Sequence, residues 1–249
     1  MVVNGSLSSA GREIVKTLLL ISVGLVVLSF FLKDRLPPTR EILDVLRRNP
    51  IQEREELPQP FEVTRKGATY TVTPLFTYDL YGMVVSYHNS DSFTDLAHKR
   101  WKDYLNVKDL CVIWGKNVES GVYRWMKFSN RDFTCYYSYP DEETFRLFSE
   151  SCLSNNHLLS VDRALIRAIM SARKGDQVHF QGYLAMYDQK ETGFHRGTSI
   201  NRDDRGNGAC ETVFLTGFTV LKRANPGWHA IFHISLFLSV AFIILLFFI

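Results

Sequence analysis

The segment GDQVHFQGYL, residues 175–184, decides the fold. It opens with a Gly-Asp pair typical of a turn and continues with apolar residues at alternate positions, the period of a strand with one buried face. Gly182 lies inside this alternation, and a glycine within a strand marks a sharp bend or the close approach of another backbone. The segment therefore predicts a strong bend within a small antiparallel structure.

Further strands and helices on both sides of this segment complete a compact domain over residues 61–225. Gly217 gives the last expected strand a second mid-strand glycine. The other expected elements are strands at 61–63, 69–72, 80–87, 110–114, 122–128, 133–139 and 212–221, and helices at 92–106, 140–148 and 161–173. The pattern predicts an α+β fold with a mainly antiparallel sheet or partial OB-like barrel, about three helices, and a transmembrane helix at each end.

Two apolar segments predict the membrane-spanning helices. The first helix is expected over residues 14–32 after a tail at 1–13, and the second over 228–249, where the run Ala230–Ile249 holds 20 residues without Asp, Glu, Lys or Arg. A secretory signal peptide is the alternative for the first run, but the sequence after it offers no small-x-small cleavage site. We therefore expect two retained anchors in a lipid bilayer.

Residues 33–60 are expected to connect the first anchor to the domain. The stretch Glu41–Arg48 predicts a short amphipathic helix, acidic at its start and basic at its end, which stops at Asn49-Pro50. Its apolar face suits either docking on the domain or contact with the membrane surface.

Charges flanking the anchors bear on which side of the membrane holds the domain. Arg12 and Lys16 lie on the terminal side, whereas seven Lys and Arg residues flank the helices on the domain side. The positive-inside rule then slightly favours a cytoplasmic over a periplasmic domain at the plasma (inner) membrane, although long domains translocate largely regardless of charge. Ser235 and Ser239 form a small-residue pair suited to packing against the first helix, and self-association through the transmembrane helices is a separate expectation.

Charge and cysteine content exclude several classes of function. The formal net charge of +3 is too small a basic excess to indicate nucleic-acid binding. The four cysteines could form two disulfides, but we expect four buried free thiols. None of them is spaced as CxxC, which argues against a zinc ribbon. These four are Cys111, Cys135, Cys152 and Cys210.

Two groups of residues offer reactive chemistry. Asp95 and His98 share a helix face and follow His88, so two imidazoles and a carboxylate suggest a metal site, yet a solvated helix start has the same composition. Cys210 with His195 or His157 as base suggests covalent catalysis, but the surrounding sequence fits no nucleophile motif. We predict no catalytic residue, no metal and no cofactor.

The polar segment Asp188–Glu211 is the strongest functional candidate. It joins two clear strands, and a loop this long inside a compact domain is usually functional or mobile. It fails the test for a calcium loop, because Arg205 occupies position 5 and Thr212 stands at position 12 in place of Glu. Gly206–Gly208 with Arg202 or Arg205 would suit an anion nest. The binding candidates are His195, Arg196, Asn201, Arg202, Asp203, Asp204 and Arg205.

Three stretches resemble an uncharacterised bacterial membrane-protein family: Tyr78–His88, Leu153–Leu159 and Gly197–Thr212. The resemblance covers most of the middle domain. It implies a bacterial envelope setting, and it implies neither an activity nor any functional residue.

These features predict a membrane-anchored, non-enzymatic domain that binds a protein or envelope partner. The alternative is a membrane-bound, hydrolase-like enzyme that uses the 188–211 loop. An enzyme needs titratable groups from distant segments to meet in one cleft, whereas a binding domain needs an exposed surface that fits its partner.

Overall fold

The computed structural model describes residues 9–92, 95–131, 133–201, 204 and 210–248. The chain divides into two compact units. One combines the two ends, Met1–Arg35 and Ala224–Ile249, and the other is the continuous segment Leu36–Arg223.

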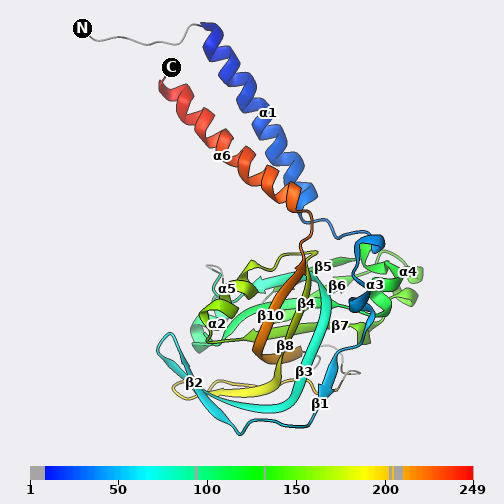
Figure 1. Cartoon of the computed structure of the whole chain (residues 1–249). Helices are drawn as coiled ribbons and strands as arrows, with labels where there is room; N and C mark the ends of the chain where they lie inside the picture. Colours follow the sequence, from blue (N-terminus) through cyan, green and yellow to red (C-terminus); the bar gives the residue numbers. More distant parts are fainter. Residues whose placement is uncertain (1–8, 93–94, 132, 202–203, 205–209, 249) are drawn as a thin grey trace. The chain divides into compact units, whose positions relative to one another are not determined.

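The first unit is a pair of long helices, α1 (Ser9–Lys33) and α6 (Pro226–Phe248). They run side by side in opposite directions (Figure 1), and both are long and apolar enough to span a membrane. The hydroxyl of Ser239 donates a 2.8 Å hydrogen bond to that of Ser22, and Ser235 is buried as well. The small residues of α6 therefore pack against α1 within the chain, the use that the sequence suggests for them.

The second unit is built mainly of strands with short helices between them. The strands are β1 (Ile51–Glu53), β2 (Phe61–Arg65), β3 (Ala68–Asn89), β4 (Asn106–Ile113), β5 (Lys127–Arg131), β6 (Thr134–Ser138), β7 (Leu153–Leu159), β8 (Gln177–Gln189), β9 (His195–Arg196) and β10 (Cys210–Lys222). The helices are α2 (Ala97–Trp101), α3 (Lys116–Ser120), α4 (Glu142–Leu147) and α5 (Arg163–Ser171). This is the α+β class, with a large and mostly antiparallel sheet, that the sequence predicts.

Five strands of the large sheet pair in a ring. β3 pairs with β4, β4 with β7, β7 with β10, β10 with β8, and β8 again with β3. All of these pairings are antiparallel except that of β7 with β10. The sheet is thus mostly antiparallel, as expected, and its strand order resembles that of the partial OB-like barrel that the sequence suggests as the alternative.

Strand β3 takes part in the ring twice because it is long and bent. The sequence suggests separate strands at 69–72 and 80–87, whereas the structure has one strand over Ala68–Asn89. Its pairing with β8 shifts register between Pro74 and Phe76, and its pairing with β4 shifts between Val84 and Ser86. The proline, which cannot donate to a ladder, lies at one of these irregular points.

Gly182 lies where β8 is paired on both sides, opposite Tyr78 of β3 and Leu215 of β10. A Cβ atom at this position would lie 2.1 Å from the carbonyl oxygen of Phe214 and 2.9 Å from Cα of Leu215. The register of β10 against β8 shifts just beyond, between Leu215 and Gly217. Glycine is thus required because two backbones approach closely, the reason expected for a mid-strand glycine.

The main core fills the ring and is covered by α5. It contains buried side chains from β3, β4, β7, β8 and β10, and Ile169 of α5 is buried among them with Leu165 and Ile166 packed alongside. Asp162 caps α5, because its carboxylate accepts hydrogen bonds from the backbone amides of Ala164 and Leu165.

The segment expected to connect anchor and domain packs into a second core. It forms two short 3-10 helices, Thr39–Glu41 and Asp44–Arg47, instead of one amphipathic helix, because the backbone between them is extended at Leu43. Leu46 is fully buried against residues of β3 and β4. Docking on the domain, one of the two roles left open by the sequence, is the one observed.

One pair of cysteines is cross-linked. Cys111 of β4 and Cys135 of β6 form a disulfide, while Cys152 and Cys210 are free thiols. The expectation of four buried thiols is therefore wrong for two of them. No local pattern singles out this pair, because only the tertiary fold brings Cys135 of β6 to Cys111 of β4.

Candidate functional site

The first half of the 188–211 segment is held against the sheet. His195 and Arg196 form the short strand β9, which pairs with Asp188 and Tyr187 at the end of β8. The next residues attach to the start of β10: Thr212 donates its backbone amide to the Thr198 hydroxyl at 2.9 Å and its own hydroxyl to the Gly197 carbonyl at 2.8 Å. Arg196 is thereby fixed in place by secondary structure on both sides.

A polar cavity of about 560 Å³ lies beneath this segment. Its walls come from β7, β9 and β10, the start of β6, and the residues that follow β9. The lining residues are Phe133, Thr134, His157, His195, Arg196, Gly197, Thr198, Ser199, Cys210 and Thr212. Arg196 is the one formally charged residue among these described lining residues, and none of them is acidic.

A chain of buried polar side chains leads from the cavity into the protein. Arg196 donates a 3.0 Å hydrogen bond to Nε2 of His157, whose Nδ1 lies 2.7 Å from Oδ1 of Asp109. Asn106 donates from Nδ2 to the same oxygen of Asp109 at 2.7 Å, and its Nδ2 also lies 3.0 Å from Nε2 of His98. We call these five residues the His98–Arg196 network.

The partners of His157 fix its tautomer. A guanidinium can only donate, so Nε2 of His157 accepts from Arg196 and the ring proton lies on Nδ1, where it is donated to Asp109. Burial alone would raise the pKa of Asp109, but the interaction with His157 and the hydrogen bond from Asn106 outweigh it and lower the pKa to about 2. Asp109 is therefore a fully buried carboxylate anion.

Cys210, the nucleophile considered from the sequence, is not activated. Its thiol donates to the carbonyl oxygen of Phe133 and accepts from the amide of Asn155. Burial raises the pKa of this thiol, and neighbouring Glu211 adds to the rise. His157 lines the same cavity, but both of its ring nitrogens are bound to Arg196 and Asp109.

Aromatic rings cover one side of the cavity. Arg196 lies over the ring of Phe133, 4.1 Å from its centroid, and Trp101 stacks on both Phe133 and Phe194. Trp101 follows β3 and Phe194 follows β8, and Thr192 also donates a hydrogen bond to the carbonyl of Trp101. The β3–β4 and β8–β10 connections therefore lie side by side at the site.

The other binding candidates lie further along the same segment. His195 pairs with Asp188 at 2.7 Å and lines the cavity, while the carboxylate of Asp204 and the carbonyl of Asn201 both accept from the Ser199 hydroxyl. Arg202, Asp203 and Arg205 lie outside the described residues. Their part in binding stays a prediction.

Three of the residues considered for metal binding meet beside the network. His88 comes from the end of β3, Asp95 precedes α2, and His98 lies within α2. One ligand atom from each lies within 4.8 Å of the other two. Asp91, from the same stretch of sequence, pairs instead with Lys66.

Asn106, Asp109 and Phe133 belong to the site but escaped the sequence interpretation. A signal was present for the first two, because they are polar residues at the start of a strand that otherwise continues into an apolar run. All eight residues of β4 are buried, so a polar group there requires an internal partner.

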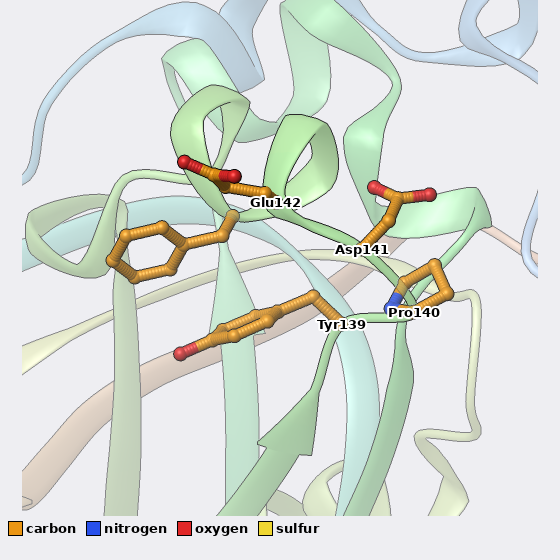
Figure 2. A pocket seen from close by; sticks show the side chains of 5 residues that line it. Tyr139, Pro140, Asp141 and Glu142 are labelled. Carbon is orange, nitrogen blue, oxygen red and sulfur yellow. The ribbon is translucent and has the colours of Figure 1, made fainter.

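A second hollow, of about 360 Å³, lies between the end of β6 and α4 and shares no lining residue with the cavity. Figure 2 shows Tyr139, Pro140, Asp141 and Glu142 around it. The carboxylate of Asp141 is used as the N-cap of α4, since it accepts from the backbone amide of Thr144 at 2.8 Å. This hollow lacks the convergent polar groups of the cavity.

Comparison of the chain with protein-family models, with curated proteins and with solved structures gives no significant match.

Proposed function

We propose that this protein is a membrane-anchored, non-enzymatic domain that binds an anionic group, a carboxylate or a phosphate, of a protein or envelope partner in the cavity at Arg196. The observation that carries the proposal is the charge of the cavity. Its described lining residues contain one guanidinium and no carboxylate.

The surroundings of Arg196 favour an external anion. Among the residues that the structure describes, no carboxylate oxygen lies within ion-pair distance of this guanidinium; its contacts are the neutral nitrogen of His157 and two aromatic faces. Asp109 lies behind His157 and does not line the cavity. A planar guanidinium held in this way suits the two oxygens of a carboxylate or phosphate.

The arrangement of the polar groups supports binding over catalysis. Hydrolysis by a side-chain nucleophile in this cavity would need that nucleophile hydrogen-bonded to a free base. Here the thiol of Cys210 has a raised pKa, and both nitrogens of His157 hold other side chains. These interactions keep Arg196 in one orientation, which lowers the entropic cost of binding.

The position of the cavity gives support by analogy with the fold. OB folds bind ligands on their second and third strands and with the loops that follow the first and fourth. The corresponding parts here are β4, β7 and the β3–β4 and β8–β10 connections, which are the parts that form the site. The analogy concerns where a ligand binds and does not identify the ligand.

The proposal also includes the location. Helices α1 and α6 would hold the domain at the plasma (inner) membrane, in agreement with their length and composition. The Cys111–Cys135 disulfide favours the extracytoplasmic side, because such cross-links persist in oxidising compartments. This is the opposite side from the one that the flanking charges slightly favour.

Capture of the partner from native membranes tests the proposal. The full-length chain is tagged, cross-linked chemically in intact cells and purified, as wild type, Arg196→Ala and the matched control Arg163→Ala. Arg163 is an exposed arginine at the start of α5. Because a charge-assisted hydrogen bond contributes about 1.5–3 kcal/mol, recovery of the partner should fall about tenfold or more only with Arg196→Ala. Equal recovery with both variants would overturn the proposal.

A further inference from the structure

We propose that His88, Asp95 and His98 form a binding site for a divalent transition-metal ion of the zinc class. Nε2 of His88 and Nδ1 of His98 lie 2.7 and 2.5 Å from the same oxygen, Oδ2 of Asp95. One imidazole would be enough to form an ion pair with Asp95, so an ion pair alone does not account for the second imidazole at the same oxygen. Three ligand atoms that converge on one point are the arrangement that a cation organises.

The carboxylate is held in the orientation that this site requires. Its other oxygen, Oδ1, accepts a 2.9 Å hydrogen bond from the backbone amide of His98. Asp95 and His98 are both buried, whereas the side chain of His88 retains 15% exposure. The two inner ligands are therefore fixed by the fold, and the outer ligand gives an ion its path from solvent.

A buried acceptor without a hydrogen-bond partner lies near His98, as a metal-bound imidazole requires. Coordination through Nδ1 places the ring proton on Nε2, which then requires an acceptor. Oδ2 of Asp103 lies 3.6 Å from Nε2 of His98, is buried and has no hydrogen-bond partner.

The ligand chemistry selects the kind of ion. Two imidazole nitrogens with one carboxylate oxygen suit zinc and its neighbours, whereas calcium and magnesium prefer oxygen ligands alone. At metal–ligand distances of about 2.0–2.2 Å in a tetrahedron, ligand atoms lie about 3.3 Å apart. The present separations of 2.5 and 2.7 Å must therefore widen by less than 1 Å. Three protein ligands leave one position for water.

The site would tie the β3–β4 connection to the end of β3. The ligands span residues 88–98, and His98 also reaches the His98–Arg196 network through Asn106. An ion bound only by the folded protein stabilises it in proportion to the logarithm of its concentration over Kd.

Zinc binding by the purified full-length protein tests this inference. The tag is removed, metal is stripped with a chelator, and ZnCl₂ is titrated by calorimetry into wild type, His88→Gln and the control His179→Gln. His179 is a matched control because it also pairs with an aspartate, Asp79, at 2.9 Å and is 20% exposed. We expect one zinc ion per chain in wild type and control, and loss of binding in His88→Gln.

Absence of stoichiometric zinc binding by the wild type, or unchanged binding by His88→Gln, would overturn the inference. If His88→Gln fails to fold, the visible absorption spectrum of the wild type loaded with Co²⁺ tests the site instead. Bands of a tetrahedral site with nitrogen and oxygen ligands support the site, and the spectrum of hydrated Co²⁺ contradicts it. Neither result depends on the partner bound at Arg196.

Discussion

Lys108 is a lysine whose whole side chain lies inside the protein. Its ammonium donates to the carbonyl of Ala172 at 2.7 Å, just beyond the end of α5, and lies 3.9 Å from the ring centroid of Tyr87. Burial lowers the pKa of Lys108 from 10.5 to about 8, although Asp176 opposes the change. The native protein therefore loses this proton at a lower pH than the unfolded chain does.

This difference predicts a rise in stability with pH. Between pH 8 and 9.5 the unfolded chain holds more protons than the native state, so the free energy of unfolding should increase with pH. The measurement is urea denaturation in detergent, followed by tryptophan fluorescence, at several pH values in this window. The slope should be more positive in the wild type than in Lys108→Met, because the raised pKa of Cys210 adds the same opposing slope to both proteins. Equal slopes in the two proteins would contradict the buried lysine.

At the scale of residues, the sequence predicts those functional groups that are close along the chain. His88, Asp95 and His98 stand out by their spacing, and His195 and Arg196 by their place in a long polar segment. The rest of the His98–Arg196 network depends on the register of β4 against β7, where Asp109 lies opposite His157. No local pattern specifies that register, so the pairing was not predictable.

Among the elements, β8 requires its mid-strand glycine most strictly. Gly182→Ala should lower the free energy of unfolding by about 1–3 kcal/mol, because the new methyl group overlaps backbone atoms of β10 that cannot move independently of the sheet. Thermal and chemical denaturation measure the change. Gly197→Ala is the control, since nothing lies within 4 Å of its added Cβ, and it should change stability by less than about 1 kcal/mol. Equal effects of both substitutions would show that Gly182 is not at a close crossing.

Element type was more predictable from sequence than element length. The alternation around residues 175–184 correctly indicates β8, but the strand continues to Gln189, and β3 joins two expected strands into one. Among the described residues of the helix expected at 92–106, Ala97–Trp101 are helical, and the left-handed conformation of Lys102, φ 51°, ends this helix. The length of a strand depends on its pairing with neighbouring strands, and a local sequence pattern carries no information about that pairing.

At the scale of the whole molecule, the disulfide connects structure to location. Native membranes are quenched in acid, denatured, and treated with a maleimide reagent of high mass. Cys152 and Cys210 should react directly, and Cys111 and Cys135 only after reduction, so reduction should raise the number of modified thiols from two to four. A Cys111→Ser, Cys135→Ser variant should give the same pattern before and after reduction. Four thiols modified without reduction would contradict an oxidising environment for the domain.

Two terminal helices suited to a membrane flank a domain whose cavity has one guanidinium among its described lining residues. A partner that enters this cavity is expected to contact Arg196. A photoreactive amino acid at Thr134, which lines the cavity, reports directly on what enters. Glu143, an exposed residue of α4, provides the control position.

The decisive measurement is ultraviolet cross-linking in living cells with the full-length chain. We predict one adduct of discrete mass from position 134 that is absent from position 143. The adduct should be retained at reduced yield with Arg196→Lys and lost with Arg196→Ala, because lysine keeps the charge but not the planar pair of donors. No adduct from position 134, or an adduct that persists unchanged with Arg196→Ala, would contradict the account.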